Sequence, residues 1–384
     1  MLDSKFKRLG DYIQEVNLRN TDLKITRLLG VNLLKEFIPS VANIVGTDLS
    51  NYKVIKKGQF GCKLMSVERD GILPISLLKD EEPAIISSAY YVFEVKDTEI
   101  LLPDYLMMYF KYPEFDRQLQ FYTGGDVRGG MGYNNFCDMR INIPSIEEQR
   151  KIVAEYQAVE QRIENNNRLI KALEDTAQAI YHHTFVENID PEYLPEGWRW
   201  GTLSDLGEII GGATPSTDIS EYWCDNGISW LSPADLSKQG TKFISKGAKD
   251  ITELGYKSCS TKILPKGSIL FSSRAPIGLM AIATQDVCTN QGFKSIVPND
   301  KFGTEYIYYY LTSIKNIIAE ENVGSTFSEV SGQTMKDYKA ILPSKDLIDL
   351  FTRKTKSIFN QQYLVEQENS ILIRTKNLLL SKLS

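Results

Sequence analysis

One series of short motifs occurs twice along this chain, and each copy ends where a long helix is predicted to begin. The first copy ends with Ile143-Pro144-Ser145 and the second with Leu342-Pro343-Ser344. Between these junctions, Leu194-Pro195-Glu196-Gly197-Trp198 marks the start of the second copy. A duplicated unit of one globular domain and one long helix predicts a molecule with pseudo-twofold symmetry. Proteins of this kind commonly recognise partners that are themselves twofold or bipartite.

Three further pairs of matching segments follow the same order in both copies. A short opening element comes first, then a glycine turn that leads into a strand, and then an aromatic amphipathic helix. These pairs are residues 8–13 and 202–209, residues 55–60 and 264–270, and residues 104–109 and 305–310. The sequence therefore predicts a mixed α/β (α+β) fold with two globular domains, residues 1–143 and 188–343. Each domain is followed by a long helix, residues 144–187 and 344–384.

The two predicted helices carry regular heptad patterns. Apolar residues recur at spacings of four and three in the first helix, and an apolar pair recurs every seven residues in the second. The predicted contact positions are Ile152, Val159, Ile163, Asn166, Ile170 and Leu173 in the first helix, and Ile358, Val365, Leu372 and Leu379 in the second. Asn166 stands where an apolar residue belongs. A single polar residue at such a position weakens the packing but fixes the register of the helices.

Two arrangements of these helices are compatible with the patterns. The helices can pair with each other, antiparallel, as a spacer between the domains, or each can pack on its own domain. At ~1.5 Å per residue, a helix of about 38 residues is about 57 Å long. This length and the strict heptads favour the antiparallel coiled coil.

The composition argues against several classes of protein. No apolar run approaches the ~18 residues of a membrane-spanning helix, and no signal peptide is predicted at the start of the sequence. The five cysteines are scattered without a Cys-x-x-Cys pair, which indicates reduced thiols and a cytoplasmic location. The net charge of −5 argues against a general polyanion binder, although a local basic surface still permits DNA binding.

Motifs that indicate catalysis are scarce. The two histidines, His182 and His183, are adjacent, so neither a histidine metal site nor a catalytic triad is expected. The sequence contains no phosphate-binding loop for ATP and no Asn/Asp-Pro-Pro-aromatic motif of the amino-methyltransferases. Asp80 with Glu94 and Lys96 is a pattern seen in Mg²⁺-dependent nucleases, but an alternating strand produces Glu-x-Lys by chance. We expect a non-catalytic chain without a metal site, and keep a self-contained nuclease as the alternative.

Features suited to nucleic acid are local. Seven lysines lie between residues 238 and 266 against only two acids, and such an excess attracts phosphates. Predicted turns carry side chains whose donors and acceptors match the edges of bases. The candidates are Lys238, Lys242, Ser272, Ser273, Arg274, Asn290, Gln291, Ser325 and Thr326 in the second domain, and Lys57, Lys63, Arg69, Thr123 and Arg128 in the first. For each of them, a role in a turn, a core or a solvated surface is the alternative.

The chain resembles the specificity (S) subunits of Type I restriction–modification systems. In the first half the resemblance lies in residues 57–60 and 69–78, and in the second half it lies in residues 194–198, 211–216 and 228–231. The start of the first long helix, Pro144-Ser145 followed by Glu147-Glu148-Gln149, completes the pattern. The second helix departs from it, because Lys345-Asp346-Leu347 replaces the Glu-Gln pair. Capping or a partner contact is therefore expected to differ at that helix start.

The resemblance implies a function in DNA recognition without catalysis. In this family each domain is a target recognition domain that reads one half of a split DNA sequence, and the paired helices set the distance between the half-sites. Two modification subunits, which bind S-adenosylmethionine and methylate adenine, and restriction subunits, which use ATP and Mg²⁺, assemble on this scaffold. No cofactor is then expected on this chain. The divergence between the two domains predicts an asymmetric target. A coiled-coil scaffold that does not bind DNA remains a further alternative.

Overall fold

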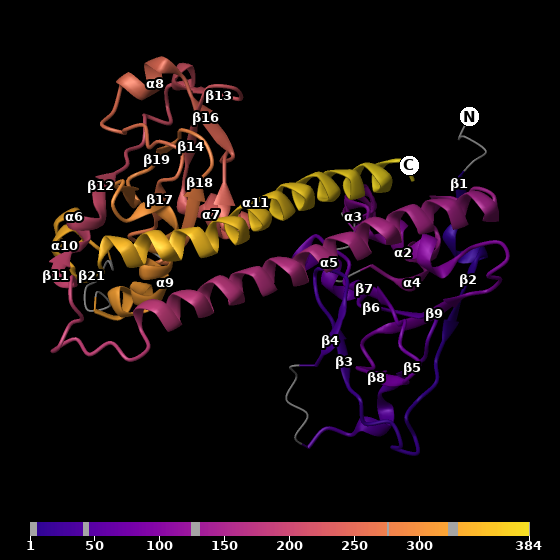
Figure 1. Cartoon of the computed structure of the whole chain (residues 1–384). Coiled ribbons are helices and arrows are strands. Elements are labelled where there is room, and N and C mark those ends of the chain that lie inside the picture. Colours follow the sequence, from indigo (N-terminus) through magenta and orange to yellow (C-terminus); the bar gives the residue numbers. More distant parts are fainter. Residues whose placement is uncertain (1–5, 41–45, 124–130, 275, 322–328, 384) are drawn as a thin grey trace. The chain divides into compact units, whose positions relative to one another are not determined.

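The computed structural model describes residues 6–40, 46–123, 131–274, 276–321 and 329–383 (Figure 1). Contacts within the chain divide it into two units. The first unit is residues 1–164 with residues 371–384, and the second unit is residues 165–370. Each unit therefore combines one globular domain with segments of both long helices. Among the helices that the structure describes, none is long and apolar enough to cross a membrane.

The first unit is built on an antiparallel four-stranded sheet with helices that cover its core. The strand order is β2 (Ile13–Val16), β9 (Tyr91–Val95), β6 (Gln59–Cys62) and β7 (Ile75–Leu77). Three two-stranded pairs surround it: β1 (Phe6–Arg8) with β10 (Arg140–Asn142), β3 (Leu29–Val31) with β4 (Phe37–Pro39), and β5 (Lys53–Ile55) with β8 (Ala84–Ile86). The helices are η1 (Leu9–Asp11), η2 (Leu49–Asn51), η3 (Leu64–Ser66), α1 (Val67–Asp70), α2 (Pro103–Lys111), α3 (Pro113–Thr123) and α4 (Tyr133–Cys137). Buried aromatic rings fill the centre of the core, namely Phe60, Phe93, Phe110, Phe115 and Phe136.

The second unit contains a five-stranded sheet and a four-stranded sheet. The five-stranded sheet has the order β12 (Gly207–Gly211), β20 (Lys294–Pro298), β17 (Ile269–Phe271), β18 (Met280–Ala283) and β15 (Phe243–Ile244). The four-stranded sheet has the order β13 (Trp223–Cys224), β16 (Lys249–Ile251), β14 (Ile228–Leu231) and β19 (Cys288–Thr289), and β11 (Arg199–Thr202) pairs with β21 (Lys339–Leu342). The helices of the domain are α6 (Leu203–Leu206), η4 (Ser220–Tyr222), α7 (Pro233–Gln239), α8 (Glu253–Lys257), α9 (Gly303–Glu321) and α10 (Gly332–Asp337).

The predicted duplication is confirmed strand by strand. The order β2-β9-β6-β7 in the first unit corresponds to β12-β20-β17-β18 in the second, and β1 with β10 corresponds to β11 with β21. The repeated glycine turn has the same backbone conformation and the same hydrogen bond in both units. Gly58 has φ +82° and Gly267 has φ +89°, a conformation that favours glycine. Each glycine N–H donates to the strand partner at 2.8 Å, Gly58 to the carbonyl of Leu78 and Gly267 to that of Ala283.

The two long helices are α5 (Ile146–Phe185) and α11 (Lys345–Ser381), and they run antiparallel to each other. In the second unit the amide Nδ2 of Asn166 donates to Oε2 of Glu368 at 2.9 Å. In the first unit Glu160 lies 3.8 Å from Lys376. An earlier residue of α5 thus meets a later residue of α11, which is the antiparallel direction and confirms the predicted pairing.

The predicted contact positions along these helices are all at least half-buried. Asn166, Val365 and Leu379 are buried, and the remaining predicted positions are Ile152, Val159, Ile163, Ile170, Leu173, Ile358 and Leu372, which are half-buried. The helix ends also enter the cores of the domains: Phe185 and Phe351 pack together in the second unit at 5.2 Å between ring centroids. The helices therefore pair with each other and also anchor the domains, so the two arrangements left open by the sequence occur together.

The two long helices start differently, as the missing Glu-Gln pair predicts. Gln149 of α5 is fully buried, and its Nε2 donates to the carbonyls of Ile100 and Pro144 at 2.9 Å each. Its Oε1 accepts from the N–H of Leu102 at 2.9 Å, at the start of α2, so one side chain fastens two helix starts together. Ile348 holds the equivalent position in α11, where it is buried in the apolar core. An amide clamp in the first unit is thus replaced by apolar packing in the second.

Candidate nucleic-acid interface

Loops of the second unit that are distant in sequence meet at one site. The N–H of Ser273 donates to the carbonyl of Gly292 at 2.8 Å, which joins the turn between β17 and β18 to the loop after β19. The hydroxyl of Thr214 donates to Oε1 of Gln291, so residues 211–216 join the same site. We call the side chains of Thr214, Arg274, Asn290 and Gln291 the polar loop cluster. The structure thus brings together Arg274 with Asn290 and Gln291, which the sequence placed in two separate turns.

A glycine makes this approach of the loops possible. A Cβ atom on Gly212 would lie 2.1 Å from the carbonyl oxygen of Asn290 and 2.2 Å from that of Thr289. Such distances exclude any side chain at residue 212, so Gly212 is required for the close approach. The indole N–H of Trp230 donates to the carbonyl of Ala213 at 3.0 Å and fixes the next residue of the loop. The cluster therefore stands on a rigid support, which is what recognition of a defined surface requires.

The polar loop cluster offers both donors and acceptors. Gln291 is exposed, while Asn290 and Arg274 are half-buried. Oδ1 of Asn290 accepts from the N–H of Gly292 at 2.9 Å, which fixes the orientation of its amide group. Lys294, nearby on β20, pairs with Glu329 at 3.3 Å. Amide and guanidinium groups held in this way match the hydrogen-bonding edges of bases and the oxygens of phosphates.

Two neighbouring candidates do not belong to an exposed surface. Ser272 and Ser273 are fully buried. The hydroxyl of Ser272 donates to the carbonyl of Pro276 at 2.7 Å and accepts from the N–H of Leu279 at 2.8 Å. The prediction that these serines contact DNA is therefore wrong, because Ser272 holds the turn together and Ser273 lies beneath it. The turn chemistry of serine explains their position in the sequence.

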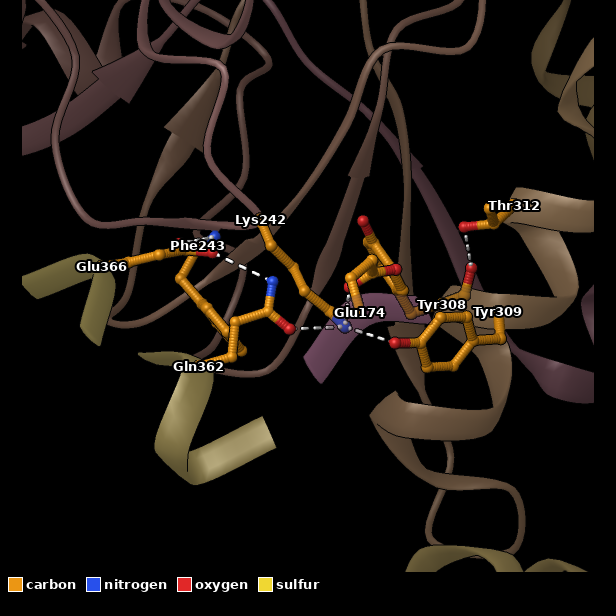
Figure 2. A network of polar contacts seen from close by, with 8 residues as sticks. All are labelled: Glu174, Lys242, Phe243, Tyr308, Tyr309, Thr312, Gln362 and Glu366. Carbon is orange, nitrogen blue, oxygen red and sulfur yellow. Dashed lines mark hydrogen bonds and ion pairs between the residues drawn. The ribbon is translucent and has the colours of Figure 1, made fainter. Parts of the chain in front are cut away.

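The prediction that Lys242 contacts DNA is also wrong, because its side chain lies inside the second unit. Its side chain is 3% exposed, and Figure 2 shows Nζ surrounded by Glu174 of α5, Tyr309 of α9 and Gln362 of α11. Nζ lies 2.9 Å from Oε2 of Glu174, 2.8 Å from the hydroxyl of Tyr309 and 3.4 Å from Oε1 of Gln362. Burial lowers the pKa of Lys242, and the charge of Glu174 opposes that effect. The six other lysines of the run are exposed, and nothing in their spacing distinguishes Lys242 from them.

A buried carboxylate lies beside this lysine. Oε2 of Glu366 accepts from the N–H of Phe243 at 3.1 Å, and its Oε1 accepts from Nε2 of Gln362 at 3.1 Å. Burial raises the pKa of Glu366, while these hydrogen bonds and the charge of Lys242 counteract the rise. No sequence pattern singles out Glu366, because it lies between heptad positions of a helix rich in charged residues.

The candidates of the first unit lie on its surface with local partners. Lys57 forms an ion pair with Glu81, and Arg69 contacts Asp70 through Nε at 2.8 Å and Nη2 at 2.7 Å. Lys63 is half-buried, with its Nζ 5.8 Å from the centre of the Tyr90 ring. Lys238 of the second unit is exposed at the end of α7. The other candidates are Arg128, Ser325, Thr326 and the side chain of Thr123, which lie outside the described residues.

The nuclease pattern is not assembled into a site. Glu94 accepts from Nε2 of Gln14 and of Gln59 on the neighbouring strands, at 2.8 Å each. Asp80 forms an ion pair with Arg27, and Nζ of Lys96 donates to the carbonyl of Gly10 at 3.0 Å. Within the described ranges no group of three His, Cys, Asp or Glu side chains is placed to hold a metal ion. No contact among the described residues favours the nuclease alternative.

Comparison with known proteins identifies the family. The family model of the Type I restriction modification DNA specificity domain matches residues 74–175 and 195–349, which is more than half of the chain. The chain belongs to this specificity-domain family. Each matched region contains one Pro-Ser junction and the start of one long helix, so the duplication seen in the fold is also a duplication of the family domain.

Individual proteins similar to this chain are named as specificity subunits of Type I restriction enzymes. The MjaIX specificity subunit of a Type I restriction enzyme from Methanocaldococcus jannaschii is 43% identical over 155 residues, covering 40% of this chain and 36% of that relative. The HindI specificity subunit from Haemophilus influenzae is 24% identical, covering 100% of this chain and 99% of the relative. The crystal structure of a Type I restriction–modification S subunit from M. genitalium matches with a TM-score of 0.60. That match covers 100% of this chain and 97% of the other at 13% identity, so it establishes a common fold.

Proposed function

We propose that this chain is the DNA-reading subunit of a Type I restriction–modification complex and acts on cellular DNA in the cytoplasm. Each of its two domains reads one half-site of an asymmetric, bipartite target. The observation that carries this proposal is the duplicated fold with unlike surfaces. The strands that the two units share have the same order, but the loop after β19 carries Asn290 and Gln291, whereas the corresponding loop after β8 carries Ser87 and Ser88. Two similar supports that present different side chains suit a target with two different halves.

The long helices support a second role as a scaffold. Leu364, Ile371 and Leu378 are 64%, 62% and 63% exposed, and they recur every seven residues on one face of α11. Large exposed apolar residues in a continuous stripe mark a protein interface. We propose that the two modification subunits dock on the exposed faces of the helices, and that restriction subunits join them. S-adenosylmethionine, ATP and Mg²⁺ then belong to these partners, and this chain supplies recognition and not catalysis.

The decisive experiment is long-read sequencing of host DNA with and without the gene for this chain. Loss of adenine methylation at one bipartite motif is the expected result, and unchanged methylation would overturn the proposal. A scaffold that ignores DNA would give no salt-sensitive DNA binding by the purified complex with modification subunits. A self-contained nuclease would cut DNA with Mg²⁺ alone, and Glu94→Ala would abolish the cutting.

A further inference from the structure

Lys242 connects the second domain to both long helices at one point. The groups around its Nζ belong to the second unit and come from three helices: Glu174 on α5, Tyr309 on α9 and Gln362 on α11 (Figure 2). The ring of Phe359, also on α11, lies on the same ammonium group. The ammonium group lies 3.7 Å from the centre of the Phe359 ring and 4.5 Å from that of Tyr309, distances at which a cation is attracted to an aromatic face. One buried charge is thus held from several directions.

Lys242 is also joined directly to the hairpin that carries Arg274. Its carbonyl accepts from the N–H of Ile282 in β18 at 2.8 Å, and Ile244 accepts from Thr284 at 2.9 Å. Strand β15 thereby pairs in parallel with β18. Strands β17 and β18 flank the turn of residues 272–279, in which Arg274 lies beside the loop of Asn290 and Gln291. One path from the helices to the polar loop cluster therefore runs through Lys242 and its neighbour Phe243, through the strand pairing of β15 with β18, and through the hairpin.

We propose that Lys242 is a positioning residue that sets the orientation of the second domain's reading loops on the helix pair, and so determines recognition of the second half-site. This inference rests on the proposed function. Hydrogen bonds and ion pairs to fixed partners define a direction, whereas apolar contact is non-directional. Buried ion pairs often add little stability, because removing charges from water is costly. The buried lysine is therefore better explained by the orientation it imposes than by the stability it adds.

The first unit lacks a counterpart of this connection in the part that the structure describes. There β7 corresponds to β18, but it is the edge strand of its sheet, with no strand equivalent to β15 beside it. The ion pairs between domain and helix in the first unit are different: Lys111 of α2 lies 3.0 Å from Glu160 of α5, and Glu99 lies 3.3 Å from Arg150 of α5. A change at Lys242 should consequently affect the second half-site and leave the first one unaffected.

The test uses the complete complex with modification subunits, and DNA duplexes that carry the motif found by sequencing. Lys242→Met keeps most of the length of the side chain and removes the charge, while Lys301→Met removes a charge from an exposed position of the same unit as the matched control. We measure methylation rates on the cognate duplex, on duplexes with one substitution in either half-site, and on duplexes whose spacer is changed by one base pair. For Lys242→Met we expect about a tenfold loss of discrimination against second-half-site and spacer changes, equivalent to about 1.4 kcal/mol, with first-half-site discrimination unchanged.

Each result is decisive. If Lys242→Met discriminates as well as the original chain, or loses discrimination equally at both half-sites, the inference is wrong. If Lys242→Met fails to fold, Glu174→Gln provides the same test, because it keeps the shape of the partner and removes its charge. If the unaltered complex methylates no specific sequence, the proposed function fails and the inference falls with it. If the original complex is specific and the variants discriminate as well as it does, the inference is refuted but the proposed function stands.

Discussion

Asn166 of α5 donates a hydrogen bond to Glu368 of α11 at 2.9 Å, in the contact between the two long helices. One residue further along each helix, Asn369 donates to Oδ1 of Asn167 at 2.8 Å. These two side-chain pairs form a polar layer in the helix contact of the second unit. Asn166 is nearly fully buried, so any shift of one helix along the other would leave its amide without a partner. The polar layer therefore specifies the antiparallel register.

Asn166→Leu is expected to stabilise the helix pair and to relax its register. Glu368 is half-buried and can turn to water, so removing the amide is expected to raise the free energy of unfolding by about 1 kcal/mol. Chemical denaturation measures the stability, and disulfide cross-linking of cysteine pairs placed across α5 and α11 measures the register. Ala158→Leu, at an exposed position of α5, is the control and should change neither. A destabilised Asn166→Leu variant with one register would contradict this account.

Gln149→Leu is expected to destabilise the first unit strongly. The change leaves the N–H of Leu102 and the carbonyls of Ile100 and Pro144 without the partner that the buried amide supplies. Unpaired buried groups of this kind cost about 1–3 kcal/mol each, so we expect a total loss of about 3 kcal/mol in urea denaturation. Ile348→Leu, at the equivalent position of α11, conserves volume and should cost less than about 1.5 kcal/mol. Equal losses for the two variants would show that Gln149 does not act as a clamp.

The contrast between Gln149 and Ile348 shows how far the sequence could predict the fold. The repeated motifs predict matching elements, and the missing Glu-Gln pair predicts that the helix starts differ, because both signals are local. The motifs also predict equivalent tertiary contacts. Tyr105 and Tyr306 hold matching positions in α2 and α9, and their hydroxyls donate to the carbonyls of Asn142 and Ile341, at 3.1 and 3.3 Å.

The candidate site was less predictable, because local spacing does not show which way a side chain points in the fold. Ser272 and Arg274 are two residues apart, yet one is buried and the other is half-exposed. Lys242 differs from the exposed lysines around it only because three helices, far apart in the sequence, surround it. Burial of this kind depends on long-range packing, which a single sequence does not reveal. The meeting of Thr214 with Gln291 depends on a sheet pairing that the sequence motifs left unassigned.

Glu366→Gln is expected to change the pH dependence of stability. Because burial raises the folded-state pKa of Glu366, its protonated form stabilises the fold fully below the ordinary pKa near 4.5. That contribution is lost as the pH rises through the raised pKa. The free energy of unfolding of the original chain, minus that of Glu366→Gln, should therefore decrease as the pH rises from about 4.5 towards neutrality. Urea denaturation at several pH values measures this difference. Glu155→Gln removes an exposed carboxylate as the control. If the free energy of unfolding of the original chain minus that of Glu366→Gln increases with pH, the raised pKa of Glu366 is wrong.

Exchange of the second domain should change one half of the recognised sequence. Replacing residues 195–343 with the corresponding domain of another specificity subunit keeps all of α5 and α11, so the helix pair and the first domain remain as they are. Methylation mapping of the hybrid should then show a new second half-site beside the original first half-site. Arg274→Ala and Gln291→Ala, in the original chain, should each lower discrimination at the second half-site by about 1–3 kcal/mol per base pair contacted. Lys57→Ala in the first domain is the matched control, and should leave the second half-site unchanged. Altered recognition of both half-sites by the hybrid would show that the two domains do not read independently.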